Sequence, residues 1–412
     1  MTFLRSSEYP PRRHAFDSLS ASARRLADRQ SETIARQIAI AEIAAPTGAE
    51  ARRADVVTQW LSAMGLAVRR DAVGNVIASI PGGARADSSA SPVVVMAHLD
   101  TVFDADVPLA VRHEGPRIVM PGIGDNGRGL AALVLLADVL RADDVGATLT
   151  HPIELVATVG EEGVGNLRGA RAYFDEIERA GTLRPVAAIA LDGPGDSLIV
   201  HHGIASRRLH VSFVGAGGHP WADPHAANAI HAAGCAVAAV AQLAKAQPPG
   251  VTVSVTRIGG GESLTSVPAG AWFDVDVRAL DGAAVGRLHE LVRRLSERAA
   301  QDTTRQHTGT LLTVTVATLG DRPGGRLDAA HPLVRLAADA TRWQQREPRS
   351  ASASTDANIP LSRGIPAITI GGGGIGGGAH TDHEWYEDVE GARGLLRALG
   401  IVATVAQGAL VM

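Results

Sequence analysis

The feature that most constrains this chain is an apolar, strand-like run that ends in polar residues. The segment "VVMAHLDT" (94–101) has the composition of a buried strand that ends at His98 and Asp100. A third such residue, Asp125, follows in the turn "GIGDNGRG" (122–129). A buried strand needs its valines but has no structural need of these side chains at its exit. Each of them alone could be an ordinary loop or turn residue, so the question is why they occur together.

Alternating strand and helix patterns predict an α/β fold with a mostly parallel central sheet flanked by helices. Short apolar runs predict strands at 76–80, 93–97, 153–159, 186–191 and 366–370. Apolar residues at helical spacing predict helices at 16–45, 50–65, 130–140, 168–180, 331–345 and 391–407.

The pattern changes near Ser206. From there to Leu319 the sequence predicts strands at 207–214, 251–258, 271–279 and 310–319 and helices at 225–245 and 283–301. This order is βαββαβ, which closes as helices on an antiparallel sheet. We therefore predict a catalytic domain in two parts, 1–205 and 320–412, interrupted by an inserted α+β lid domain at 206–319. A length of 412 residues agrees with two domains.

Composition narrows the class of function. A net charge of −4 gives no reason to expect a nucleic-acid partner. The single cysteine, Cys235, excludes an intrachain disulfide and fits a reducing compartment. Neither a secretory signal nor an apolar window of about 18 residues is present, so we expect a cytoplasmic protein without a membrane partner.

Polar residues also follow the other predicted strands of the central sheet. Besides His98 and Asp100, they are Glu161, Glu162, Asp192 and His380. In open α/β sheets, ligands bind at the carboxyl ends of the strands. Because like carboxylates repel and are costly to bury, such a cluster indicates bound divalent cations. Imidazole and carboxylate donors without thiolate favour zinc, with manganese or cobalt as alternatives.

Six motifs, in this order, resemble the dinuclear-zinc exopeptidase family that contains carboxypeptidase G, peptidase T, aminoacylase and succinyl-diaminopimelate desuccinylase. They are "HLDT" (98–101), "GDNGRG" (124–129), "GEEG" (160–163), "LDG" (191–193), "GAGGHPWADPHAANAI" (215–230) and "AHTDHEW" (379–385). The sequence pattern is most similar to that of the peptidase T-like branch of this family. Any one motif is weak, but six in order make a specific signal.

The resemblance implies a set of metal ligands. Asp125 would bridge two divalent ions, with zinc expected and manganese or cobalt as alternatives. His98 and Asp192 would complete one site, and Glu162 and His380 would complete the other. Two such ions can polarise a scissile carbonyl and lower the pKa of a bound water.

The resemblance also assigns two residues beside the ligands. Glu161 would be the general base that takes a proton from the water and passes it to the leaving amine. Asp100 would accept the second ring N–H of His98 and so fix the tautomer of that ligand.

Three further residues are candidates for binding the substrate. His219 matches a family histidine that stabilises the tetrahedral oxyanion, although a turn role before Pro220 is the alternative. Arg278 matches an arginine that grips a substrate carboxylate, and a surface cation on a strand is the alternative. Asp356 is a candidate for a substrate amine, with a helix-capping or loop role as the alternative.

The leading hypothesis is hydrolysis of a peptide or peptide-like amide bond at a chain end, as in a di- or tripeptidase. Hydrolysis of N-acyl amino acids is the close alternative, because the same metal chemistry serves both. A non-catalytic metal-binding relative is a third hypothesis, which the presence of Glu161 disfavours. A serine hydrolase is excluded by the lack of a G-x-S-x-G elbow. The helix at 225–245 could supply the interface of a homodimer.

Overall fold

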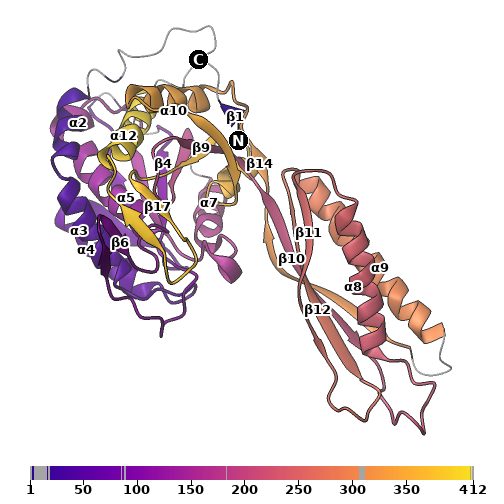
Figure 1. Cartoon of the computed structure of the whole chain (residues 1–412). Coiled ribbons are helices and arrows are strands. Elements are labelled where there is room, and N and C mark those ends of the chain that lie inside the picture. Colours follow the sequence, from indigo (N-terminus) through magenta and orange to yellow (C-terminus); the bar gives the residue numbers. More distant parts are fainter. Residues whose placement is uncertain are drawn as a thin grey trace. The chain divides into compact units, whose positions relative to one another are not determined.

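The chain consists of two compact units (Figure 1). The computed structural model describes residues 2–3, 16, 19–84, 86–87, 90–181, 183–305, 311–408 and 410. Unit 1 comprises Met1–Gly203 and Arg326–Met412, and unit 2, Ile204–Gly325, is inserted into its sequence. The sequence predicts the insertion at 206–319. Its last strand, β13 (Thr313–Arg322), continues beyond that limit, and the short β14 (Gly325–Arg326) spans the boundary.

Unit 1 is built on a large mixed sheet. Its strands lie in the order β1 (Thr2–Phe3), β15 (Arg349–Ala353), β9 (Leu198–Gly203), β16 (Ala367–Ile370), β8 (Ala187–Leu191), β4 (Val93–His98), β7 (Ile153–Thr158), β3 (Val76–Ile80) and β2 (Ala67–Arg70). At its centre, β4 pairs in parallel with β7 and β8, and β8 pairs in parallel with β16. Antiparallel strands flank this centre. The predicted α/β fold with its mostly parallel central sheet is confirmed.

Side chains of the central strands alternate between two cores, because successive residues of a strand point to opposite faces. Val93 and Val95 of β4 belong to one cluster, and Val94 and Met96 belong to the other. The first cluster includes residues of α2 (Ser20–Ala27), α3 (Gln30–Ala41), α4 (Ala51–Ala63), α5 (Gly127–Leu140), α6 (Asp143–Gly146), α10 (Pro332–Trp343) and α12 (Ala392–Ala406). The second includes α7 (Arg168–Ala180) and α11 (Asn358–Ser362). Burial on both faces explains why β4 reads as a continuous apolar run.

The predicted helix at 16–45 is wrong as a single element. The chain forms α2 and α3 and turns between them at Asp28 and Arg29. The Arg29 guanidinium pairs with Glu32 of α3 and with Asp138 of α5. These ion pairs hold the turn against the core helix.

Among the described residues, the helices are too short or too polar to span a membrane.

A small antiparallel sheet in unit 1 has no counterpart in the prediction. It consists of β17 (Ile375–Gly377), β18 (Trp385–Glu387), β6 (Arg117–Val119) and β5 (Arg112–Glu114). Strands of three residues are too short to give a period, and the glycine run conceals β17. The sheet pairs β6, which leads into the turn with Asp125, with β18, which follows the loop of His380.

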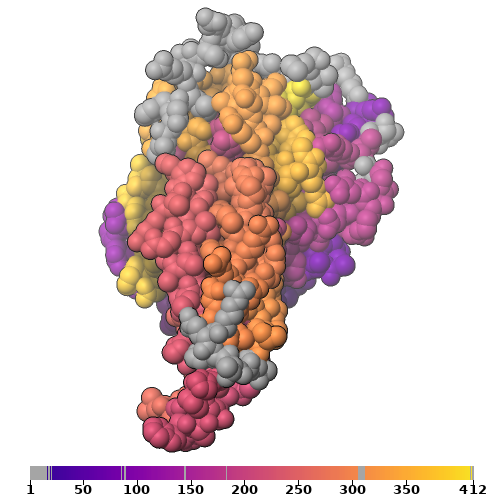
Figure 2. Space-filling view, turned by 90° about the vertical axis from the view of Figure 1, so that its right-hand side faces the viewer, coloured from indigo at the N-terminus to yellow at the C-terminus, as the bar shows by residue number. Residues whose placement is uncertain are grey.

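Unit 2 is a four-stranded antiparallel sheet with two helices on one face. The strand order is β11 (Val251–Gly260), β12 (Gly270–Ala279), β10 (Ala205–Val214) and β13. The helices α8 (Ala229–Lys245) and α9 (Gly282–Arg305) share a core with alternate residues of these strands, such as Phe213 and Phe273. Figure 2 shows the two helices side by side on the surface. The predicted βαββαβ order is confirmed.

Candidate metal centre

Parallel strands bring several predicted site residues to one edge of the unit 1 sheet. Strand β4 ends at His98, and Asp192 directly follows β8. Glu161 and Glu162 lie just beyond the end of β7, and both are buried. Because β4, β7 and β8 run in the same direction, these residues share the carboxyl edge of the sheet.

Asp125 lies between two histidines. Its Oδ1 atom is 3.0 Å from His98 Nε2, and its Oδ2 atom is 3.1 Å from His380 Nε2. Asp192 Oδ1 is 3.7 Å from the same nitrogen of His98, and Glu162 Oε1 is 3.0 Å from His380 Nε2. The five residues predicted as metal ligands therefore come together in two groups that share Asp125.

The donor atoms fit a bound divalent cation. His98, Asp125 and Glu162 each offer one ligand atom, and these atoms lie within 4.8 Å of one another. The Oδ1 atom of Asp125 is buried and accepts no hydrogen bond from the described residues. Buried polar atoms normally have a hydrogen-bond partner. Because this oxygen accepts no hydrogen bond, a cation can be its partner instead. Imidazole and carboxylate donors suit zinc and its neighbours in the first transition row.

The two histidines lie in a strongly negative environment. Hydrogen bonds with Asp125 and Glu162 raise the pKa of His380 to about 10. Burial opposes the charged form of His98, yet the surrounding carboxylates raise its pKa well above the usual range. Burial also raises the pKa of Asp192. A divalent cation would displace the histidine protons, since metal ligation needs the neutral imidazole.

Asp100 fixes the His98 ring differently from the prediction. The Nδ1–H of His98 donates to the backbone carbonyl of Asp100 at 3.0 Å, whereas the nearest carboxylate oxygen is 3.6 Å away. A carbonyl can only accept, so the proton resides on Nδ1 and leaves Nε2 facing Asp125. The Asp100 carboxylate instead accepts the backbone N–H groups of Glu161 and Glu162, each at 2.9 Å. Asp100 therefore sets the loop that carries both glutamates.

Asn126 and Glu384 bind ligand-bearing loops, although the sequence pattern predicts no role for either residue. Asn126 donates to the carbonyl of Leu191 and accepts the N–H of Gly193, and so holds both neighbours of Asp192. Glu384 accepts N–H groups from the turn that contains Asp125. Burial raises the pKa of Glu384 to about 7. Asn126 lies in the motif "GDNGRG" and Glu384 in the motif "AHTDHEW". Their place in these motifs was the sign of a role that the sequence offered.

Three fully buried arginines brace the loops behind the site by donating to backbone carbonyls. Arg53 donates to the carbonyl of Leu99, next to His98 in sequence. Arg128 and Arg397 donate to the carbonyls of residues 371–372, where the chain leaves β16. Burial lowers the pKa of Arg53 and of Arg397 to about 10. These cations were not singled out in the sequence, because arginine is mostly a surface residue.

Asp356 is buried rather than open to a substrate. It is 3% exposed, and one carboxylate oxygen accepts a hydrogen bond of 2.5 Å from the hydroxyl of Thr158. The other oxygen accepts none from the described residues. Burial raises the pKa of Asp356 to about 6. This position does not support the predicted contact with a substrate amine, nor does its side chain cap α11.

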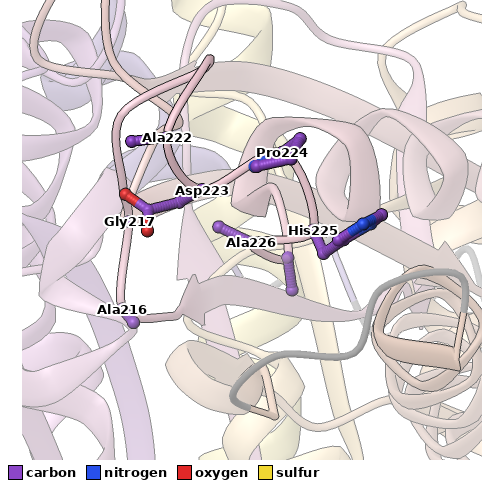
Figure 3. Close-up of a pocket in the computed structure, with 8 residues that line it drawn as sticks. Ala216, Gly217, Ala222, Asp223, Pro224, His225 and Ala226 are labelled. Carbon is purple, nitrogen blue, oxygen red and sulfur yellow. The ribbon is translucent and has the colours of Figure 1, made fainter.

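His219 lies in an exposed turn of unit 2. Its Nδ1 atom accepts the backbone N–H groups of Trp221 and Ala222, each at 3.2 Å. The ring proton of neutral His219 therefore resides on Nε2, which can donate to a ligand. Asp223 accepts the backbone N–H of His219 and lines a pocket of about 360 Å³ with Ala216, Gly217 and other residues up to Ala227 (Figure 3).

Arg278 lies on β12 with its guanidinium engaged. Its Nε and Nη2 atoms donate to the two carboxylate oxygens of Asp276, at 3.1 and 3.0 Å. This hydrogen bonding raises the pKa of Arg278 above its usual value. A half-exposed pair of this kind is also what a surface cation would form, so the alternative of a surface role stays open.

Two peptidases of solved structure share the fold of this chain. The aminopeptidase PepT of Bacillus cereus superposes with a TM-score of 0.72 at 22% identity, over 92% of this chain and 99% of that one. A tripeptidase of Staphylococcus aureus gives a TM-score of 0.75 at 20% identity, over 91% and 98%. At these identities the likeness establishes the fold alone.

Comparison of sequences identifies a relative and a family for this chain as well as a shared fold. An N-carbamoyl-L-amino acid amidohydrolase of Geobacillus stearothermophilus is 32% identical over 155 residues, which are 37% of this chain and 31% of that protein. The chain thus matches about a third of the length of that curated relative. The sequence model of peptidase family M20/M25/M40 matches residues 94–407, which include all six motifs. This chain is a hydrolase that belongs to peptidase family M20/M25/M40.

Proposed function

We propose that this hydrolase cleaves a peptide or peptide-like amide bond at a chain end, on di- or tripeptides, with two bound divalent ions. The position of Asp125 carries the proposal. One of its carboxylate oxygens lies near His98 and the other near His380. A carboxylate that offers one oxygen to each of two donor groups is suited to bridge a pair of cations.

The proposed ligands divide into two sets. Asp125 would contact both ions, His98 and Asp192 would hold one, and Glu162 and His380 would hold the other. Zinc fits these nitrogen and oxygen donors, and manganese and cobalt are alternatives. When bound, the ions would polarise the scissile carbonyl and activate the attacking water.

Glu161 is the proposed general base. It would take a proton from the attacking water and deliver it to the leaving nitrogen. Its backbone N–H is held by Asp100, while the adjacent Glu162 directs its carboxylate to His380. Glu162 has an extended backbone, in which neighbouring side chains point to opposite sides. One glutamate can therefore bind metal while the other serves the substrate.

Unit 2 is proposed to take part in binding the substrate. The Nε2–H of His219 would donate to the oxyanion that forms at the scissile carbonyl. Arg278 would grip a substrate carboxylate with its planar fork, in competition with Asp276. We further propose that unit 2 closes as a lid and that α8 contributes to a homodimer.

Hydrolysis of N-acyl amino acids, including N-carbamoyl amino acids, is the second candidate. The similarity to the amidohydrolase of Geobacillus stearothermophilus favours it, because 155 residues are 32% identical. The same metal chemistry would serve both substrates, so the difference would lie in the groups that hold the acyl portion.

A substrate panel tests the proposal. Purified protein loaded with Zn²⁺, Mn²⁺ or Co²⁺ is incubated with dipeptides, tripeptides, N-acetyl amino acids and N-carbamoyl amino acids, and released amine is measured. Faster release from peptides supports the peptidase, and faster release from N-carbamoyl substrates supports the second candidate. Metal-loaded protein that hydrolyses none of them would favour the non-catalytic alternative.

A further inference from the structure

Glu384 makes hydrogen bonds that have no part in the roles assigned to the motif residues or in the proposed mechanism. Its carboxylate accepts three backbone N–H groups, from Gly122, Gly124 and Asp125, at 2.7 to 2.8 Å. The residue is only 2% exposed. All three donors belong to the turn that presents Asp125. The side chain therefore fixes the backbone of the residue proposed to bridge the two ions.

Glu384 also ties this turn to the loop of the other ligand. Its backbone carbonyl accepts the N–H of Met120, at the start of the turn, and its backbone N–H donates to Thr381, next to His380. The short sheet extends this link, because β6 precedes the turn and β18 follows Glu384. One residue thus joins the chain segments of Asp125 and His380, whose side chains lie 3.1 Å apart.

The turn is built around this carboxylate. A Cβ atom on Gly124 would lie 3.1 Å from Glu384 Oε1 and 3.3 Å from Pro194, tighter than ordinary contact. The absence of a side chain at Gly124 lets the backbone approach Glu384 closely. A larger residue there would push the turn, and Asp125 with it, away from the carboxylate.

Stability alone gives little reason for Glu384. A second carboxylate is buried beside Asp125, and the two negative charges disfavour each other. The three N–H groups offset part of that cost. The arrangement gains a clear purpose when cations are bound, because they would reverse the sign of the local field.

We propose that Glu384 is a positioning residue that holds the Asp125 turn against the His380 loop and so sets the geometry for binding both ions. The inference rests on the proposed dinuclear centre. It differs from the role of Asp100, which holds the loop of Glu161 and Glu162. Loss of Glu384 should act on metal affinity through Asp125, the one ligand shared by both sites.

The test compares three variants of the full chain. Glu384→Gln keeps the shape but places an NH2 group against an N–H of the turn, and Glu384→Ala removes all three acceptor contacts. Glu387→Gln is the matched control, because Glu387 lies three residues later and pairs with Arg117 rather than with a ligand loop. Zn²⁺ affinity and stoichiometry are measured by competition with a chelator, and the unfolding temperature of each metal-free protein is recorded.

We expect Glu384→Gln to weaken Zn²⁺ binding about tenfold and Glu384→Ala about a hundredfold, within the range seen when outer-shell partners of metal ligands are lost. Glu387→Gln should bind as the native chain does. The metal-free unfolding temperature of Glu384→Gln should change little, because relief of the repulsion with Asp125 offsets the loss of an acceptor for one N–H of the turn.

Two results would overturn the inference. One is native Zn²⁺ affinity in both Glu384 variants. The other is a lower metal-free unfolding temperature in Glu384→Gln with native affinity, which would give Glu384 a purely structural role. A native chain that binds no ion at all would refute the proposed dinuclear centre itself, together with this inference.

Discussion

Two groups of buried polar residues, one from each unit, are satisfied over very different distances along the sequence. In unit 2, the hydroxyls of Ser296, Thr303 and Thr304 donate to carbonyls four residues earlier in α9. In unit 1, Asp100 and Glu384 accept N–H groups from residues 61 and 259 positions away. The first kind of bond is internal to one helix. The second kind arranges separate loops around a common point.

This difference indicates where function is concentrated. Carboxylates such as Asp100 and Glu162 are costly to bury, and their convergence at one sheet edge has no stabilising reason of its own. The unit 2 core is mainly Ala, Val, Leu and Phe, and its candidates His219 and Arg278 lie outside that core. Unit 1 should therefore carry the chemistry, and unit 2 should modify it.

The largest effect is expected at Glu161. Glu161→Gln keeps the shape but cannot accept a proton, so turnover should fall about a hundredfold to ten-thousandfold with both ions retained. Glu162→Gln should lower metal content as well, because a neutral amide is a poor ligand. Turnover and metal content are measured for both variants. Near-native turnover in fully metallated Glu161→Gln would make the assigned base wrong.

Removal of His219 tests whether unit 2 contributes to the reaction. His219→Ala should lower turnover about a hundredfold, the cost of losing one oxyanion donor, while metal content stays native. His225→Ala, in the same loop, is the matched control and should leave turnover unchanged. Equal rates for the two variants and the native enzyme would confine the chemistry to unit 1.

The pH dependence of the metal-free protein should reflect unit 1. The pKa of His380 is about 10 in the fold, against an ordinary value of 6.5. A raised histidine pKa contributes stability that is fully present below pH 6.5 and is lost as the pH rises towards 10. Urea unfolding of metal-free protein at several pH values should show this decline, and His380→Asn should flatten it. An unchanged slope in His380→Asn would exclude this histidine as the cause.

Much of the site is predictable because of simple geometry. His98, Asp192 and the two glutamates follow parallel strands, and parallel strands end at one edge. Strand β4 is recognisable because both of its faces are buried. The predicted partner residue of His98 is Asp100, and the nearer acceptor in the structure is the carbonyl of Asp100, at 3.0 Å, rather than its carboxylate, at 3.6 Å.

Other parts could not be derived from the sequence. The contact of Glu384 with Asp125 joins residues 259 positions apart. The strands that bring these segments together, β6 and β18, are only three residues long each. No periodicity marks such short strands. The hydrogen bond of buried Asp356 likewise comes from Thr158, 198 positions away at the end of β7.

The smallest effects sharpen the comparison between the units, because one hydroxyl can be deleted from each. Ser296 of α9 is fully buried, and its hydroxyl donates to Val292 at 2.8 Å. That carbonyl is also an acceptor of the helix, so Ser296→Ala should cost less than about 1 kcal/mol of unfolding free energy.

The counterpart in unit 1 is Thr158→Val, which keeps the shape of the side chain. It removes the hydroxyl that donates to Asp356 and leaves a buried carboxyl without a hydrogen-bond donor among the described residues. A buried group that loses its partner costs about 1 to 3 kcal/mol. Because the pKa of Asp356 is about 6, the loss should be larger at pH 8, where the group is charged, than at pH 5. Urea unfolding of both variants at the two pH values measures this contrast. Equal, pH-independent losses would mean that the two units bury their hydroxyls at the same cost and that the contrast between them is wrong.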